Sequence, residues 1–124
     1  MNYQSVAEAV ADLEAHPVES RGSVYHPIPF PEFAHLKTSS DSGEVLEKWR
    51  MIERALHDLF PAGLAGKRIL DIGANAGFYT FSLAQQGAVV SAFESHPRYG
   101  PLGRFLAAEK KLSVQWRDAA FSAP

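Results

Sequence analysis

Apolar residues in the first half of the chain repeat at helical spacing in two stretches. At the start of the first stretch, Ser5 and Glu8 have the spacing of a capping box. The apolar positions that follow fall on one helical face: Val6, Ala9, Val10 and Leu13. Because the residue before a proline avoids the helical region, His16 and Pro17 should end this helix.

A longer helix is predicted after residue 40, with Asp41 and Glu44 as its capping pair and Pro61 beyond its end. Its apolar stripe consists of Val45, Trp49, Ile52, Leu56 and Leu59. Between the two helices, prolines at positions 27, 29 and 31 exclude a regular helix and favour an extended segment. Aromatic residues interleaved with these prolines indicate that the segment packs on the body of the protein: Tyr25, Phe30 and Phe33.

After residue 65 the pattern changes to short apolar runs that alternate with helical segments. The runs KRILDIG, AVVSAFE and LSVQW have the composition of buried strands. The segments between them are predicted helices, the first ending at Gly87 and the second carrying Pro101 in its first turn. Strands alternating with helices are typical of a parallel sheet with right-handed crossovers. We therefore expect an α/β fold of about three strands preceded by two helices, with a cap region at 1–65 and a partial α/β domain at 66–124.

Composition narrows the possible functions. The chain has 124 residues, the size of one domain, and 46% hydrophobic residues, as in ordinary globular proteins. A net charge of -2 gives no footprint for nucleic acid or an anionic membrane, although a basic patch outside this chain would leave nucleic acid open as a partner. Without cysteine, neither a disulfide nor a thiolate metal site can form, and no other metal-ligand spacing occurs. Since the N-terminus lacks a signal-peptide pattern and no segment is long enough to span a bilayer, the expected location is cytoplasmic.

The segment that points to chemistry is DIGANAG, residues 71–77, at the turn from the first strand into the next helix. Ligands bind at the carboxyl ends of strands in open parallel sheets, and glycines there let the backbone approach a ligand closely. A dinucleotide site would need glycines where the chain has Asn75 and Phe78. Asp71 would also repel a diphosphate, whereas it suits a ligand with ammonium and sulfonium charges. The alternative is a tight turn without a ligand.

The stretch KRILDIGANAGFYTFSLAQQGAVVSAFE resembles motif I and the following segment of the class I S-adenosylmethionine-dependent methyltransferases, whose pattern is D/E-x-G-x-G-x-G. Asn75 stands at the middle glycine, a variant that also occurs within the family. The resemblance covers roughly residues 66–120 and implies the N-terminal half of a Rossmann-like domain that binds S-adenosylmethionine. It also implies that these loop residues contact the cofactor: Asp71, Gly73, Ala74, Asn75 and Gly77.

Two further acids complete the implied site. Glu94 ends the second strand, about 20 residues beyond the glycine loop, as a ribose-binding acid does, and a carboxylate can accept both ribose hydroxyls. Asp118, with Ala119 beside it, resembles the acid that meets the adenine amino group. The alternatives are a surface glutamate and a loop aspartate that caps a turn. His26 and His35 are weaker candidates for a base near the substrate, because lone histidines are more often structural, and the catalytic residues stay unassigned.

Two functions fit these features. The first is methyl transfer from S-adenosylmethionine to an unidentified acceptor (a small molecule, a sugar or a tRNA base), with this chain as the cofactor-binding half and inactive alone. The second is a truncated, non-catalytic module that binds the cofactor or a partner chain. A three-stranded parallel sheet would leave the first strand as an unpaired edge, so we expect a homo-oligomer through that edge. Alternatively, the N-terminal helices fold over the edge and keep the chain monomeric.

Overall fold

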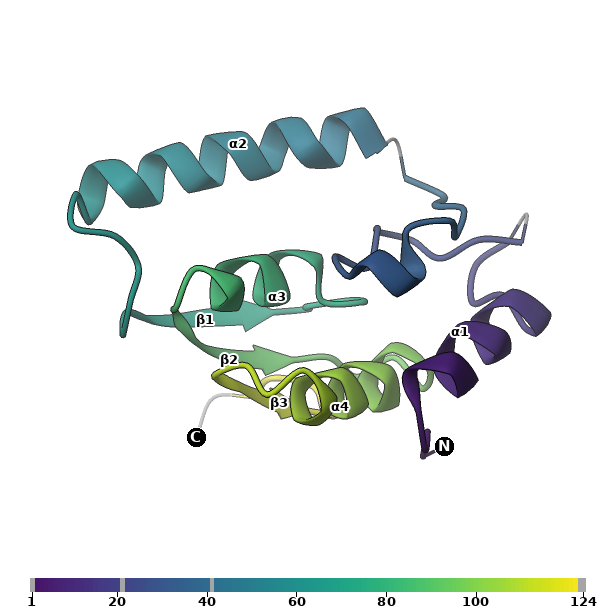
Figure 1. Cartoon of the computed structure of the whole chain (residues 1–124). Coiled ribbons are helices and arrows are strands. Elements are labelled where there is room, and N and C mark those ends of the chain that lie inside the picture. Colours follow the sequence, from purple (N-terminus) through teal and green to yellow (C-terminus); the bar gives the residue numbers. More distant parts are fainter. Residues whose placement is uncertain (1, 21, 41, 123–124) are drawn as a thin grey trace.

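A sheet of three parallel strands carries the other elements of the fold (Figure 1). The computed structural model describes residues 2–20, 22–40 and 42–122. The strands are β1 (Arg68–Ile72), β2 (Val89–Phe93) and β3 (Val114–Arg117). The helices are α1 (Val6–Ala15), the short 3₁₀ helix η1 (Pro31–Phe33), α2 (Ser42–Leu59), α3 (Phe78–Gln85) and α4 (Tyr99–Glu109). This arrangement confirms the α/β fold predicted from the sequence, the N-terminal half of a Rossmann-like sheet preceded by two helices.

The strand register brings the carboxyl ends of all three strands to one edge of the sheet. Ile72 pairs with Phe93 in β2, and Phe93 pairs with Arg117 in β3. The residues that follow these three strand ends therefore lie along the same edge: Gly73, Glu94 and Asp118. The two crossovers that this order requires are supplied by α3 and α4.

Helices cover one face of the sheet and leave the other face open. Successive strand residues point to opposite faces, and α3 packs on β2 while α4 packs on β3. On the covered face, Val90 and Ala92 are fully buried and Trp116 nearly so. On the opposite face, the side chains of Leu70 and Ile72 are 52% and 56% exposed. The described part of the chain thus presents an apolar sheet face to solvent.

The N-terminal segments complete the main core, which lies on the covered face of the sheet. The hydroxyl of Ser5 accepts a hydrogen bond from the amide of Glu8 at 3.1 Å, which confirms the predicted cap of α1. Ala9 and Leu13 of α1 are buried in the core. The proline-rich segment packs on the same core, as predicted, through Val24, Ile28, Phe30 and Phe33. It differs from the predicted extended segment at Pro31, which opens one turn of 3₁₀ helix because its ring presets a helical φ.

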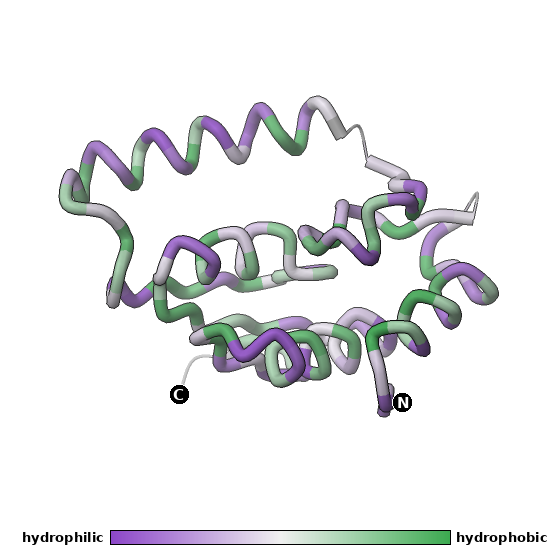
Figure 2. Tube along the Cα trace, viewed as in Figure 1, coloured by the Kyte–Doolittle hydropathy of each residue, from purple (hydrophilic) through white to green (hydrophobic). Residues whose placement is uncertain are grey.

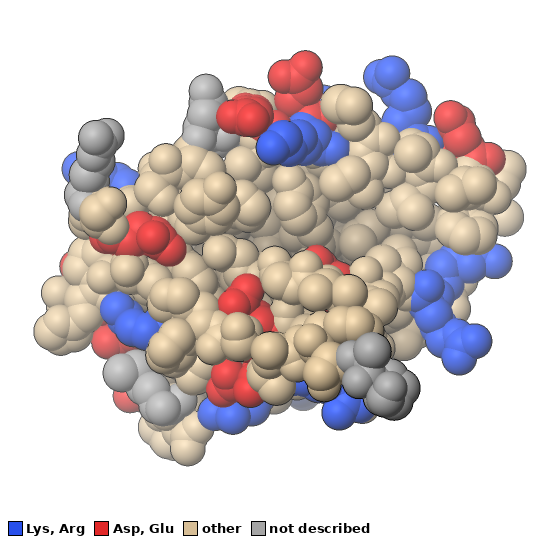
Figure 3. All heavy atoms as spheres, turned by 180° about the vertical axis from the view of Figure 1, so that it is seen from behind, with Lys and Arg blue, Asp and Glu red and all other residues tan. Residues whose placement is uncertain are grey.

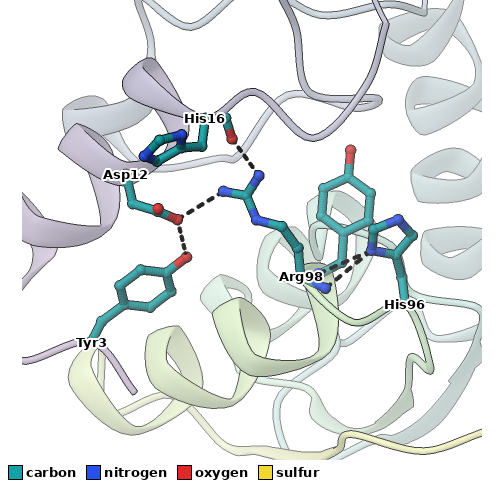
Figure 4. Close-up of polar contacts among 6 residues, drawn as sticks. Tyr3, Asp12, His16, His96 and Arg98 are labelled. Carbon is teal, nitrogen blue, oxygen red and sulfur yellow. Dashed lines mark hydrogen bonds and ion pairs between the residues drawn. The ribbon is translucent and has the colours of Figure 1, made fainter. Parts of the chain in front are cut away.

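Arg98, at the start of α4, ties that helix to α1 (Figure 4). Its Nη2 lies 2.7 Å from Asp12 Oδ2, and its Nη1 donates to the carbonyl of His16. The hydroxyl of Tyr3 donates to the same Asp12 carboxylate at 2.7 Å. This network holds the first helix against the chain that leaves β2.

Helix α2 is amphipathic, with green and purple segments alternating along it in Figure 2. Val45 is buried, and Trp49 and Leu56 pack on a second cluster built from α3, β2 and the loops beside them. The rest of the predicted stripe was wrong, since Ile52 is 38% and Leu59 71% exposed. The reason is that α2 is longer than α3, the helix over which it lies, so that α3 covers only part of the stripe (Figure 1). Its predicted cap at residue 41 lies outside the described residues.

Charges of both signs are interspersed on the surface seen from behind in Figure 3. This agrees with the small net charge of the sequence. Of the helices in the described ranges, none is long and apolar enough to cross a membrane.

Candidate cofactor-binding site

The turn from β1 into α3 contains three left-handed backbone conformations within five residues. The φ angles are 73° at Gly73, 56° at Asn75 and 89° at Gly77. Non-glycine side chains adopt this region rarely, so the turn depends on its glycines. A Cβ atom added at Gly73 would meet no other atom within 4 Å. Gly73 therefore leaves free space beside the backbone, into which a ligand can approach.

Asn75 explains why the middle glycine of the motif is dispensable in this chain. Asparagine is one of the few residues that tolerate a left-handed φ, because its short amide can bond to the local backbone. Here Asn75 Oδ1 accepts a hydrogen bond from the amide of Ala76 at 2.8 Å. The departure from glycine is thus compatible with the loop conformation that the motif requires.

Gly77 has a different task from Gly73. It is buried at the start of α3, and a Cβ atom there would overlap the ring of Phe81. The Phe81 ring in turn stacks on Trp116 of β3, with centroids 5.6 Å apart. Gly77 therefore lets α3 pack closely on the sheet, and its predicted contact with a cofactor stays a prediction.

Glu94 is held by two backbone amides at the carboxyl end of β2. Its Oε1 accepts from the amide of Asn75 at 2.6 Å, and its Oε2 accepts from the amide of His96 at 2.8 Å. A carboxylate has about four lone-pair sites, so each oxygen can accept another hydrogen bond. The glycine loop thus orients the Glu94 carboxylate and leaves it lone pairs that can accept hydrogen bonds from ligand hydroxyls.

A cavity of about 260 Å³ lies beside Glu94 at the strand ends. Its lining includes three of the predicted cofactor residues, Gly73, Glu94 and Ala119. The remaining lining residues are Ile72, Phe93, Ser95, Ala120 and Phe121. Register alone explains the convergence, because Gly73 and Glu94 follow paired residues of β1 and β2.

Asp118 is oriented differently from the other predicted residues. It does not line this cavity; its Oδ2 lies 3.5 Å from Arg104 Nη1, and its carboxylate lies against Gly100 of α4. The structure therefore gives Asp118 a role in fixing α4 to the end of β3. Its contact with adenine stays a prediction.

Asp71, the last polar residue of β1, faces the covered side of the sheet. Its Oδ2 accepts a hydrogen bond from the hydroxyl of Thr80 at 2.6 Å, and Thr80 is fully buried in α3. Burial raises the pKa of the Asp71 carboxyl and the negative charge of Glu94 adds to the rise, whereas Thr80 and His26 oppose it. A bound cation beside Asp71 would relieve the cost of its charge. Two acids beside this loop, Asp71 and Glu94, suit a cationic ligand better than a diphosphate.

A second cavity, of about 370 Å³, lies between the proline-rich segment, α2 and α3. Its lining consists of Tyr25, His26, Ser40, Glu44, Val45, Lys48 and Tyr79. Burial lowers the pKa of His26, the charge of Lys48 lowers it further, and Asp71 acts in the opposite direction. This cavity is therefore within electrostatic reach of Asp71. His35, the other candidate base, is exposed and pairs with Glu14 instead.

Sequence reasoning overlooked Thr80, Lys48 and Tyr79 as parts of the site. Thr80 lies in the first turn of α3, a place from which a hydroxyl can reach back to the preceding strand end. Lys48 and Tyr79 lie 31 positions apart, and no local pattern connects them. In the described ranges, no group of three His, Asp or Glu residues has the geometry of a metal site.

Comparison with known proteins gives a direct test of the resemblance. No protein-family model matches the chain. A ubiquinone biosynthesis O-methyltransferase of Pseudomonas aeruginosa strain LESB58 is 33% identical over 74 residues, which cover 52% of this chain and 32% of that protein. The corresponding protein of strain UCBPP-PA14 is 32% identical over the same length. The resemblance to class I methyltransferases is confirmed. The chain spans about a third of the length of these curated relatives.

Solved structures add evidence on the fold. A crystal structure of WbdD superposes with a TM-score of 0.65 at 20% identity, over 90% of this chain and 24% of that one. A second structure, described as the bifunctional kinase-methyltransferase WbdD, gives 0.64 at 20% identity over 89% of this chain and 23% of that one. At this identity the likeness concerns the fold alone. It agrees with the predicted α/β fold, the N-terminal half of a Rossmann-like sheet.

Proposed function

We propose that this chain is the S-adenosylmethionine-binding half of a methyltransferase whose whole form transfers a methyl group to an oxygen acceptor. One observation carries the proposal: Gly73, Glu94 and Ala119 converge on one cavity at the strand ends, next to the buried Asp71. The oxygen acceptor is supported by the curated relatives, which are O-methyltransferases. The acceptor molecule itself is a separate question.

The residues at the site suit this cofactor in charge and shape. The free lone pairs of Glu94 would accept the two ribose hydroxyls, and the open space at Gly73 would admit the cofactor backbone. Asp71 would lie toward the ammonium and sulfonium charges, whose presence would stabilise its ionised form. Ala119 would flank the adenine ring, with Asp118 next to it.

When bound, S-adenosylmethionine would supply an activated methyl group whose departure leaves a neutral thioether. The contribution of the protein would be to orient the cofactor and to exclude water from it. Glu94 would fix the ribose, and the glycine loop would fix the position of the charged end relative to Asp71. These roles need a rigid loop, and the hydrogen bond from Asn75 to Glu94 provides part of that rigidity.

Calorimetry with S-adenosylmethionine and S-adenosylhomocysteine tests the proposal. Gly73→Val should abolish binding, because the new side chain would fill the space beside the loop. Gly63→Val is a matched control, since Gly63 has a positive φ of 100° and equally open surroundings but lies outside the site. We expect Gly63→Val to retain the affinity of the original chain. Loss of binding in both variants, or in neither, with folding verified by circular dichroism, would contradict the site assignment.

A further inference from the structure

The second cavity has properties that the cofactor does not account for. It is lined from the proline-rich segment and from helices α2 and α3, and by none of the residues that surround Glu94. Tyr79 directly precedes Thr80, whose hydroxyl donates to Asp71 at 2.6 Å, and the ring of Tyr79 lies against that of His26. The cavity therefore opens near the end of the glycine loop at which the reactive group of the cofactor would lie.

Flat aromatic groups form the walls of this cavity. The ring of His26 stacks on Tyr25 with centroids 4.5 Å apart and an interplanar angle of 28°. Tyr79 meets the edge of His26 at 5.9 Å, and Trp49 lies behind Tyr79 at 6.3 Å. Aromatic walls favour a planar ring as guest. The charged groups at the rim are Lys48 and Glu44, which pair at 3.4 Å, so the cavity favours an uncharged guest.

His26 differs from three of the other four histidines of the chain in its polar contacts. His35 pairs with Glu14, His57 bonds to Gln86, and the ring of His96 accepts from the amide of Arg98. By contrast, no hydrogen bond from a described residue engages either ring nitrogen of His26. A half-buried imidazole without a polar partner, facing a cavity, is available to a ligand.

The backbone of Tyr25, directly before His26, is firmly anchored. The hydroxyl of Tyr99 accepts from the amide of Tyr25 at 2.8 Å. The carbonyl of Tyr25 accepts from both the amide and the hydroxyl of Ser40, at 3.1 and 2.6 Å. A group held in this way is preorganised, which both binding and proton transfer require.

We propose that this cavity is the acceptor subsite, that it takes an uncharged planar ring bearing a hydroxyl group, and that His26 is the general base. The proposal rests on the proposed function. His26 would accept the hydroxyl proton while the acceptor oxygen forms a bond to the methyl carbon of the cofactor. The carbon–sulfur bond would break at the same time with its electron pair left on sulfur, and His26 would later release the proton to water.

The charges around His26 are consistent with this role. Burial and the nearby Lys48 lower the pKa of the imidazole, and Asp71 raises it, with a lowered pKa as the result. Tyr79, Tyr25 and Glu44 also face the cavity. His26 is thus neutral at pH 7 and able to accept a proton.

Binding of catechol to the full chain, with S-adenosylhomocysteine present, is the test. Nuclear magnetic resonance would follow the ring signals of His26 during titration with catechol and with 1,2-dimethoxybenzene, which has the same ring but no hydroxyl. We expect catechol to shift these signals and to bind about tenfold more tightly than the dimethoxy compound, the value of one good hydrogen bond. This preference should vanish as the pH falls below the pKa of His26, since imidazolium cannot accept the bond.

His26→Phe should keep the aromatic wall and remove the preference for catechol, with affinity for S-adenosylhomocysteine unchanged. His35→Phe is the matched control and should behave like the original chain, because His35 lies outside the cavity. If S-adenosylhomocysteine binds but catechol does not shift His26, or the preference survives in His26→Phe, the acceptor subsite is refuted and the proposed function stands. If the original chain does not bind S-adenosylhomocysteine, the proposed function fails and the subsite with it.

Discussion

At the scale of single residues, stability and binding make opposite demands on Asp71. Because its pKa is raised in the folded chain, its contribution to stability is full below the ordinary value of 3.8 and is lost as the pH rises through the raised pKa. Ionised Asp71 therefore destabilises the fold at pH 7. That cost is understandable if the charge serves to hold a cationic ligand.

Asp71→Asn should accordingly raise the melting temperature at pH 7 while weakening S-adenosylmethionine binding by at least about tenfold, through loss of the charge. Thermal melting and calorimetry on the same samples measure both effects. Asp58→Asn, at an exposed position of α2, is the control and should change neither. A lower melting temperature with unchanged affinity would show that Asp71 is a structural residue only.

Glu94 gives the second test at this scale. If its carboxylate holds both ribose hydroxyls, Glu94→Gln should weaken cofactor binding by about 1.5–3 kcal/mol, the range for hydrogen bonds to charged groups. A 2′-deoxy analogue should then lose much less affinity in the variant than in the original chain. Glu109→Gln, at an exposed position of α4, provides a comparison. Equal losses for the analogue in variant and original would mean that Glu94 does not contact the ribose.

The sequence indicated the candidate residues at the strand ends, Gly73, Glu94 and Ala119, and missed cavity residues that no motif marks. Asp71, Gly73 and Asn75 belong to one turn, whose spacing matches the motif, and Glu94 and Ala119 follow the ends of β2 and β3. Tyr25 and Tyr79 come together only because the proline-rich segment folds over α3. No spacing rule connects such distant positions, since their contact is a property of the tertiary structure.

At the scale of elements, Asp12 determines how α1 is attached to α4. Burial would raise its pKa, but hydrogen bonds from Tyr3 and Arg98 and the charge of Arg98 outweigh this effect, and the pKa is lowered. The resulting stability is present above the ordinary value of 3.8 and is lost as the pH falls through the lowered pKa. Burial also raises the pKa of Tyr3 to about 12, so its hydroxyl remains a donor at neutral pH.

Asp12→Asn should therefore lower the free energy of unfolding at pH 7 by about 1–3 kcal/mol, because Arg98 loses its charged partner. Below pH 3 the difference between variant and original should shrink. Denaturant unfolding at both pH values measures this. Glu14→Gln removes an exposed acid of the same helix and should have little effect. An equal loss of stability at both pH values would contradict the charge-based explanation.

The spacing of apolar residues predicted the strands and helices well, but it overestimated how much of the apolar stripe of α2 is buried. The strands follow from short apolar runs, and their order follows from the rule for parallel crossovers. The stripe of α2 is periodic over its whole length, yet Leu59 is exposed. How much of such a stripe is buried depends on how far the neighbouring elements extend along the helix, and the local sequence does not show that extent.

At the scale of the whole molecule, the sheet is open on one face and at one edge. Among the described strands, β1 has a neighbour only in β2, so the other row of its backbone groups has no strand partner. Leu70, Ile72 and Val89 lie on the open face with 41–56% of their surface exposed. The N-terminal helices leave this apolar face uncovered.

We propose that the 124-residue chain self-associates, pairing β1 with β1 of a second copy across a two-fold axis. A second copy would satisfy the unpaired backbone groups and bury the same apolar side chains on both partners, a gain that grows with each side chain removed from water. Light scattering over a dilution series should show a dimer at high micromolar concentration. Leu70→Lys should shift it toward monomer, because charge on an edge strand opposes pairing. Met51→Lys places the same charge on α2, at an exposed position away from the sheet, and should leave the dimer intact. A monodisperse monomer of the original chain at that concentration would refute the pairing and would mean that water satisfies the edge of β1.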